Sequence, residues 1–224
     1  RSTPSNSSAA SDVYKRQVID ASVSMTIEDN AGSTSFDTAI EEARAIVDTC
    51  QAGDAVSVFG AGPTPQAVIA NPTTDHEHVR DALATLKSGS GSMQVAESLV
   101  AAAGALSEGK NPAKWIVLIT DGQNVGWDLR NEGRWRFLSS VLADSPSPPR
   151  IICRTLGLPE RFANLAVEKV TPSRRVVGTD RALTIDVTVA NTGSEPLEPA
   201  QVELEIDGLP LEPARCGQVL AQCP

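Results

Sequence analysis

The segment KWIVLIT, residues 114–120, constrains the fold of this chain more than any other stretch. It is nearly all apolar, so both faces of the strand that it would form avoid water. A strand of this kind is typical of the centre of a parallel sheet whose two faces are covered by helices. The segment therefore predicts an α/β fold.

Strand-like and helix-like patterns alternate on both sides of this central strand. Further strands are expected at residues 13–20, 55–60, 66–70 and 150–157, the third of them as a hairpin partner or a sheet edge. Apolar residues at helical spacing predict a helix that Ser35 caps, a helix that Thr74 or Asp75 opens, and two more that begin near residues 95 and 134. This alternation predicts a doubly wound, Rossmann-like sheet with helices on both faces over residues 18–162.

The composition changes after this first domain. In TIDVTVA, residues 184–190, and in VELEI, residues 202–206, apolar and polar residues alternate with a period of two. The turn-forming NTGSEP, residues 191–196, follows the first of these segments. Residues 165–224 are therefore expected to form an immunoglobulin-like antiparallel β-sandwich that is cut short.

The first 17 residues, RSTPSNSSAASDVYKRQ, do not resemble the rest of the chain. They are polar and rich in serine, and they have no apolar core of a signal peptide. The part SAASDVYKRQ resembles the translation of a sequencing-library adapter. Lys15, Arg16 and Gln17 are also poor residues for a strand buried on both faces. We expect residues 1–17 to be a non-native or disordered segment that supplies at most part of the first strand, and the chain to be a fragment.

Charge and composition exclude several classes of function. The net charge of -9 argues against nucleic-acid binding, which needs clusters of Lys and Arg. No apolar run approaches the roughly 20 residues that cross a bilayer, so this fragment is expected to be soluble. The chain has four cysteines, and their spacing is not that of zinc ligands; they are Cys50, Cys153, Cys216 and Cys223. They are either free thiols or include a Cys216–Cys223 disulfide bridge.

Oxygen-bearing side chains follow two of the expected strands. In VIDASVSM, residues 18–25, Asp20, Ser22 and Ser24 stand at alternate positions, and Asp121 follows the central strand in TDG. If these strands are neighbours, their carboxyl ends bring both Asp residues near one point. Carboxylates and hydroxyls are ligands for hard cations such as Mg²⁺. A polar loop with Asx and Ser turns is the simpler interpretation, and the matched position of Asp121 favours the metal site.

The motifs DASVSM and VLITDGQ resemble those of the von Willebrand factor type A domain. In that family the D-x-S-x-S pattern and the later Asp form a metal-ion-dependent adhesion site. The resemblance implies that Ser22 and Ser24 bind Mg²⁺ or Mn²⁺ directly, while Asp20 and Asp121 act through water. It also implies that a carboxylate from a partner protein takes the free coordination position. The chain is then a protein-interaction or adhesion module and not an enzyme.

One position departs from the family pattern. The family has a Thr in a second loop, and the alignment of the helix from residue 95 puts Met93 at that place. A thioether is a poor Mg²⁺ ligand. Ser92, one residue earlier, is either a substitute ligand or only the helix N-cap.

The combination of motifs also resembles bacterial membrane-anchored proteins of the Bat, or aerotolerance-regulator, type. The segment from residue 170 resembles a cell-adhesion-related sandwich of the CARDB kind. The resemblance implies transmembrane helices on either side of these domains, a periplasmic location for the first domain, and a MoxR-type AAA+ ATPase as a functional associate.

Three functions are therefore open. A metal-dependent protein-interaction module is favoured by the D-x-S-x-S and TDG motifs. A degenerate domain that binds partners without metal is the second, because of Met93. A metal-assisted hydrolase is the third; it needs an acid, base or nucleophile beside the ion, and His76 and His78 are expected at the exposed start of a helix instead.

Overall fold

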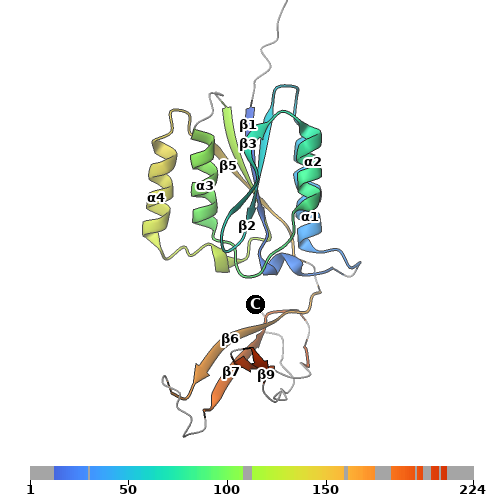
Figure 1. Ribbon diagram of the computed structural model, residues 1–224, viewed down its shortest axis with the longest axis vertical. Coiled ribbons are helices and arrows are strands. Elements are labelled where there is room, and N and C mark those ends of the chain that lie inside the picture. The colour runs from blue at the N-terminus through green and yellow to red at the C-terminus, as the bar shows by residue number, and fades with distance from the viewer. Residues whose placement is uncertain are drawn as a thin grey trace, which may run out of the picture. The chain divides into compact units, whose positions relative to one another are not determined.

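We analysed a computed structural model of the chain, which divides into two compact units (Figure 1). The α/β unit comprises Arg1–Thr26 and Ser33–Leu158, and the β unit comprises Ile27–Gly32 and Pro159–Pro224. The structure describes residues 13–29, 31–107, 113–158, 161–174, 183–194, 196–198, 203–206 and 208–210.

The α/β unit contains a five-stranded sheet in the order β3-β2-β1-β4-β5. Its strands are β1 (Val13–Asp20), β2 (Ala55–Ala61), β3 (Gln66–Thr73), β4 (Ala113–Thr120) and β5 (Arg150–Thr155). All neighbours are parallel except β3, which pairs with β2 as an antiparallel edge strand. The expected α/β sheet is confirmed, and so is the expected hairpin at its edge.

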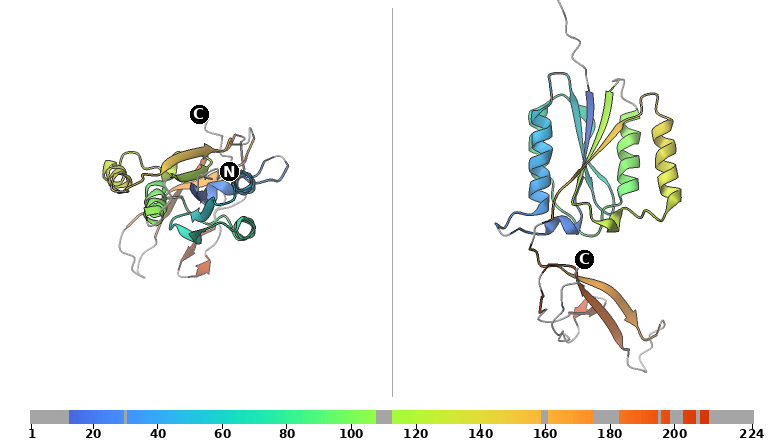
Figure 2. Two further views of the ribbon diagram at one scale, coloured as in Figure 1. Left: turned by 90° about the horizontal axis from the view of Figure 1, so that it is seen from above. Right: turned by 180° about the vertical axis from the view of Figure 1, so that it is seen from behind.

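Helices cover both faces of this sheet (Figure 1, Figure 2). One face carries α1 (Ser35–Asp48) and α2 (His76–Thr85), and the other carries α3 (Val95–Ser107) and α4 (Glu132–Ala143). Two short 3₁₀ turns, η1 (Val23–Thr26) and η2 (Asn124–Gly126), follow β1 and β4. Both turns thus lie at carboxyl ends of central strands.

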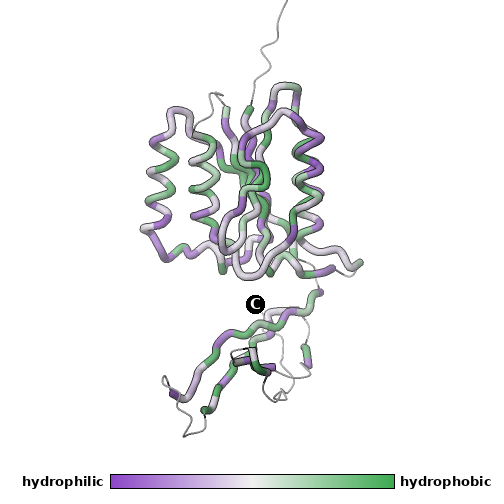
Figure 3. Tube along the Cα trace, in the orientation of Figure 1, coloured by the Kyte–Doolittle hydropathy of each residue, from purple (hydrophilic) through white to green (hydrophobic). Residues whose placement is uncertain are grey.

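Alternate residues of the central strands feed two apolar layers. In β1, Ile19 belongs to the layer beneath α1 and α2, whereas Val18 belongs to the layer beneath α3 and α4. In β4, Ile119 and Leu118 divide in the same way. Figure 3 shows the hydrophobic residues concentrated along the strands. Burial of both faces accounts for the uninterrupted apolar sequence of β4.

The helix starts differ slightly from the sequence prediction. The N-cap of α1 is Thr34 and not Ser35: Thr34 Oγ1 accepts a hydrogen bond from Asp37 N at 3.0 Å, and Asp37 Oδ2 accepts one from Thr34 N at 2.9 Å. This reciprocal capping box explains the shift by one residue. The N-cap of α2 is Asp75, whose Oδ1 accepts a hydrogen bond from His78 N at 3.0 Å.

Three consecutive polar side chains are buried in the middle of β1. Lys15 Nζ forms a 3.1 Å salt bridge with Asp54 Oδ2, and Arg16 Nη2 donates to a backbone carbonyl of β3 at 2.9 Å. Gln17 Nε2 donates to a backbone carbonyl of α1 at 2.8 Å. Arg16 Nε, Arg16 Nη1 and Gln17 Oε1 have no hydrogen-bond partner in the part of the chain that the structure describes. Arg16 and Gln17 are thus accommodated only in part, as their poor fit to a buried strand predicts.

The β unit contains two antiparallel pairs. β6 (Leu165–Pro172) pairs with β7 (Ile185–Asn191), and β8 (Glu205–Ile206) pairs with β9 (Leu209–Pro210). This antiparallel unit agrees with the expected small β domain. The proposed Cys216–Cys223 bridge lies outside the described residues, and Cys50 and Cys153 are free thiols. Among the described residues, no helix is both long and apolar enough to cross a membrane.

Candidate functional site

A small pocket opens at the carboxyl ends of β1 and β4. Its volume is about 90 Å³. The loop after β1, the loop before α3 and the loop after β4 contribute its lining, which consists of Asp20, Ser22, Val23, Ser24, Gly91, Ser92, Met93, Asp121, Gln123, Val125 and Gly126. All five site residues expected from the sequence line this one pocket, together with Met93.

The sheet order brings the two carboxylates together. β1 lies directly beside β4, and Ile19 pairs with Ile119 in the parallel register. Asp20 and Asp121 therefore leave neighbouring strands at nearly the same level. Both carboxylates are buried. This is the arrangement expected at the strand ends of an open α/β sheet.

Asp20 is held by two donors. Its Oδ1 accepts a hydrogen bond from Ser22 N at 2.9 Å, and its Oδ2 accepts one from Thr120 Oγ1 at 2.6 Å. Burial, and to a smaller extent the charge of Asp121, raise the pKa of Asp20, while the bonds from Ser22 and Thr120 act in the opposite direction. The pKa of Asp20 is thus raised by burial although two hydrogen bonds fix the orientation of its carboxylate.

The two serine hydroxyls converge through the η1 turn. Ser22 Oγ and Ser24 Oγ lie 3.0 Å apart, and Met25 N donates to Ser22 O at 3.1 Å to close the turn. Ser22 is buried and Ser24 is half-buried. Alternate residues of the D-x-S-x-S motif thus reach the same pocket, because the chain turns immediately after the strand.

Asp121 has one oxygen that lacks a donor. Its Oδ1 accepts a hydrogen bond from Gln123 N at 3.0 Å, but its buried Oδ2 has no hydrogen-bond partner among the described residues. Gly122 follows with a φ of 74°, and a Cβ there would lie 2.7 Å from Thr155 Cγ2. A buried carboxylate oxygen without a donor is unfavourable unless a cation or another group satisfies it. The donor set therefore fits a hard divalent cation.

Met93 lies in the loop before α3 and offers no oxygen side chain to the pocket. It is buried and packs in the apolar layer beneath α3. Its carbonyl lies against Gly126, where a Cβ would come within 2.1 Å of Met93 O. Ser92 is half-buried, and α3 begins only at Val95, so Ser92 is not the helix N-cap. Ser92 is thus the hydroxyl that this loop adds to the pocket lining.

No other cluster competes with this pocket as a metal site. Within the described ranges, no group of three or more His, Cys, Asp or Glu side chains is placed to hold an ion. His76 Nε2 lies 2.9 Å from Asp54 O, and His78 is exposed near the start of α2. Neither histidine lines the pocket.

Some contributors were not foreseen from the sequence. Thr120 is the last residue of the most apolar strand, and its hydroxyl orients Asp20. Its place beside Asp121 was the available signal. Val23, Val125 and Gln123 also line the pocket, but their sequence neighbourhood does not distinguish them from ordinary loop residues.

Comparisons with known proteins agree with the fold of the α/β unit. Residues 17–123 match the family model of the von Willebrand factor type A domain. No curated protein matches the chain.

Several solved structures are similar to the chain. The BatB protein of Bacteroides thetaiotaomicron has 18% identity and a TM-score of 0.55, over 79% of this chain and 80% of that one. An aerotolerance-related membrane protein of Bacteroides fragilis has 20% identity and a TM-score of 0.52, over 79% and 81%. A von Willebrand factor type A protein of Catenulispora acidiphila has 20% identity and a TM-score of 0.52, over 66% and 34%. At these identities the likeness concerns the fold.

Proposed function

We propose that this protein, which contains a von Willebrand factor type A domain, binds a protein partner through a divalent cation held at the pocket between β1 and β4. Domains of this type are in general protein-interaction modules. The finer proposal is that the cation is Mg²⁺ or Mn²⁺ and that its binding controls the interaction. The observation that carries it is the buried Asp121 Oδ2, which lacks a donor among the described residues that surround it.

The chain's own residues have distinct roles in this proposal. Ser22 and Ser24 hold the ion through their hydroxyls, and Asp20 and Asp121 supply negative charge around it. Thr120 and the backbone N–H of Ser22 keep the Asp20 carboxylate oriented. Hard cations prefer such oxygen donors and keep several waters. When bound, the cation supplies a positive charge at the mouth of a pocket that otherwise holds two carboxylates.

The partner is proposed to offer an Asp or Glu side chain. A small open pocket with a positive centre attracts a carboxylate, which is a hard oxygen ligand like those of the site itself. Apart from carboxylates and hydroxyls, the lining has no His, Cys or Lys among the residues that the structure describes, so a hydrolase would lack a separate base or nucleophile beside the ion. The interaction module is therefore preferred over the metal-assisted hydrolase.

A separate proposal, based on sequence resemblance, concerns the cellular setting. The motifs of this chain resemble those of Bat-type proteins, and we propose that the full-length protein is anchored in a bacterial cell membrane with this domain on the periplasmic side. A MoxR-type AAA+ ATPase is the proposed functional associate. A CARDB-like sandwich is the proposed fold of the C-terminal part.

Calorimetric titration of Mg²⁺ and Mn²⁺ into the full chain tests the metal site. Saturable binding is expected in the wild type, and Asp20→Ala is expected to weaken it by about 10- to 100-fold. Because Asp20→Ala leaves two buried donors unpaired, Ser24→Ala serves as a second variant that removes only a half-buried hydroxyl. Asp81→Ala, on the exposed face of α2, is the matched control.

The outcome also decides between the two binding hypotheses. If no metal binds to the wild type, the domain is a metal-independent scaffold, which Met93 would explain. If Asp20→Ala and Ser24→Ala bind the ion as well as the wild type does, the pocket is not the metal site.

A further inference from the structure

Exposed apolar side chains lie at the pocket and at a hollow that shares a residue with it. Val23 is 55% exposed, Val125 is 74% exposed and Leu129 is 64% exposed. Val23 and Val125 line the pocket itself, and Val125 and Leu129 line a shallow hollow that adjoins it. We call these three residues the apolar rim. Single exposed apolar residues need no explanation, but a group beside a polar pocket points to a binding surface.

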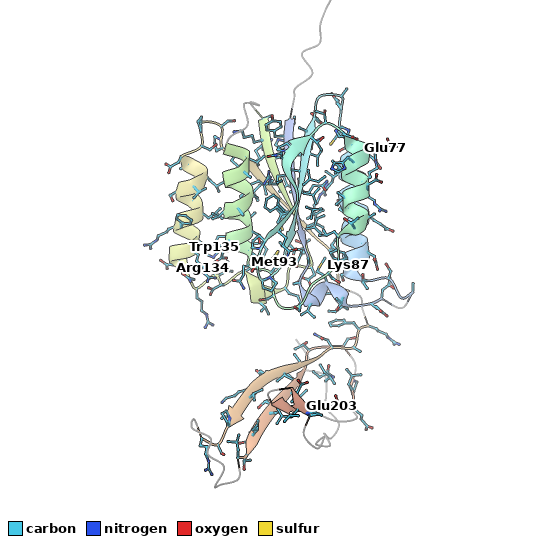
Figure 4. The ribbon with its side chains drawn as sticks, viewed as in Figure 1. Glu77, Lys87, Met93, Arg134, Trp135 and Glu203 are labelled. Carbon is cyan, nitrogen blue, oxygen red and sulfur yellow. The ribbon has the colours of Figure 1, made fainter. Side chains whose placement is uncertain are left out.

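The adjoining hollow has a volume of about 630 Å³, and two arginines, Arg130 and Arg134, line it. Arg134 in this hollow is paired with Glu97 at 3.2 Å and with Asp128 at 3.5 Å. Arg130 lies in the same lining, is exposed, and has no ion-pair partner in the described part of the chain. The hollow therefore favours a ligand with negative charge. Figure 4 shows Arg134 and Met93 at the same end of the α/β unit.

The segment that carries Val125 and Leu129 is held in place before any ligand arrives. Trp127 stacks on Trp135 with ring centroids 6.2 Å apart and planes inclined by 11°. Gly126 lies against the carbonyl of Met93, and Asn131 N donates to Asp128 O at 3.0 Å. A surface that is ordered in advance loses less conformational entropy on binding. This surface is thus suited to a defined partner segment.

We propose that the partner segment carries an Asp or Glu flanked by a bulky aliphatic side chain, which packs on the apolar rim while the carboxylate enters the pocket. The inference rests on the proposed function, because it assumes that the carboxylate is bound there. Its new content is the second contact, with Val125 and Leu129 as the residues that select the flanking side chain. Arg130 favours an overall acidic segment.

Three synthetic peptides test the inference: acetyl-SGLDLGS-amide, acetyl-SGSDSGS-amide and acetyl-SGLNLGS-amide. Calorimetric titration of each into the full chain in saturating Mg²⁺ gives the affinities. The Leu-flanked Asp peptide is expected to bind about tenfold more tightly than the Ser-flanked one, since partial burial of one Leu side chain on the rim suffices for that ratio.

Matched variants assign the effect to the rim. Val125→Ser and Leu129→Ser are expected to remove the preference for the Leu-flanked peptide. Phe137→Ser is the control, because Phe137 is also 58% exposed but lines neither the pocket nor the hollow.

The outcomes separate the two proposals. Equal affinity for the Leu-flanked and Ser-flanked Asp peptides overturns the rim inference and leaves the proposed function standing. Equal affinity for the Asp and Asn peptides overturns the proposed carboxylate site. If none of the peptides binds, both proposals are overturned.

Discussion

Arg16 is the residue whose replacement should stabilise this protein most clearly. Its side chain is fully buried in β1, where Nη2 donates to Ala70 O at 2.9 Å and the guanidinium lies 4.5 Å from the centroid of the Phe59 ring. Nε and Nη1 have no partner among the described residues. Burial lowers the pKa of Arg16 to about 10. We expect the uncharged, unbranched substitution Arg16→Met to increase the free energy of unfolding.

The magnitude follows from the pKa and the contacts that are lost. At neutral pH Arg16 is protonated in both states, and the lower pKa in the folded state corresponds to about 3 kcal/mol in favour of unfolding. Loss of the part-buried bond to Ala70 O removes about 1 kcal/mol. Loss of the contact with Phe59 removes roughly 0.5–1 kcal/mol. The net gain is about 1–2 kcal/mol, or roughly 2–8 °C in Tm for a chain of this size.

Thermal and urea unfolding of the full chain, followed by circular dichroism, measure this gain. Arg80→Met is the matched control, because Arg80 forms an exposed salt bridge with Asp48 and its loss should change stability by less than about 0.5 kcal/mol. A lower Tm for Arg16→Met than for the wild type would refute the reasoning. It would mean that the contacts of the guanidinium outweigh the penalty of burying it.

Three further predictions concern other positions. Met93→Thr should tighten Mg²⁺ binding by about tenfold in calorimetry, since it adds a hydroxyl to the pocket; unchanged affinity would show that this loop does not reach the ion. Gly126→Ala should lower stability by about 1–3 kcal/mol in urea unfolding, because its Cβ would come within 2.1 Å of Met93 O, whereas Gly133→Ala in α4 should raise it by roughly 0.5–1 kcal/mol. Asp54→Asn should lower stability by about 3 kcal/mol because it leaves buried Lys15 unpaired, against less than about 1 kcal/mol for Asp48→Asn. Burial acts to raise the pKa of Asp54, but hydrogen bonds from Gln51, Lys15 and Val13 outweigh it and hold that pKa below its ordinary value. The stabilisation that ionised Asp54 contributes should therefore be complete above about pH 4 and disappear as the pH falls further.

Local patterns were sufficient to predict most of the α/β unit. The apolar run of β4 and the helical spacing in α1 depend only on neighbouring residues and on burial, so the sheet and its helices followed from them. The predicted N-cap of α1 was wrong by one residue because Thr34 and Ser35 are both good N-caps. Asp37, three residues after Thr34, decides between them by closing the capping box.

The convergence of the expected residues on one pocket followed from topology, whereas contacts between residues far apart in the sequence did not. Adjacent strand ends were enough to expect Asp20 and Asp121 in one pocket. The bond from Thr120 to Asp20 joins residues 100 positions apart. The Oδ2 of Asp121 lacks a donor among the described residues, which depends on how the surrounding loops fold. Neither has a sequence pattern of its own. The exposure of Val125 and Leu129 likewise emerges only from the fold.

The buried polar residues Lys15, Arg16 and Gln17 lie in the middle of β1, whereas Asp20 of the proposed site lies at its carboxyl end. Arg16 lies four residues before Asp20, about 13 Å along an extended chain, which is beyond the roughly 7–10 Å within which substitutions usually couple. The polar residues of β1 contact Asp54, β3 and α1, whereas Asp20 contacts Ser22 and Thr120. The two sets share no partner. The cost of burying Arg16 and Gln17 therefore falls on the stability of the sheet and not on the geometry of the pocket, and Arg16→Met is a suitable background in which to measure metal and peptide binding.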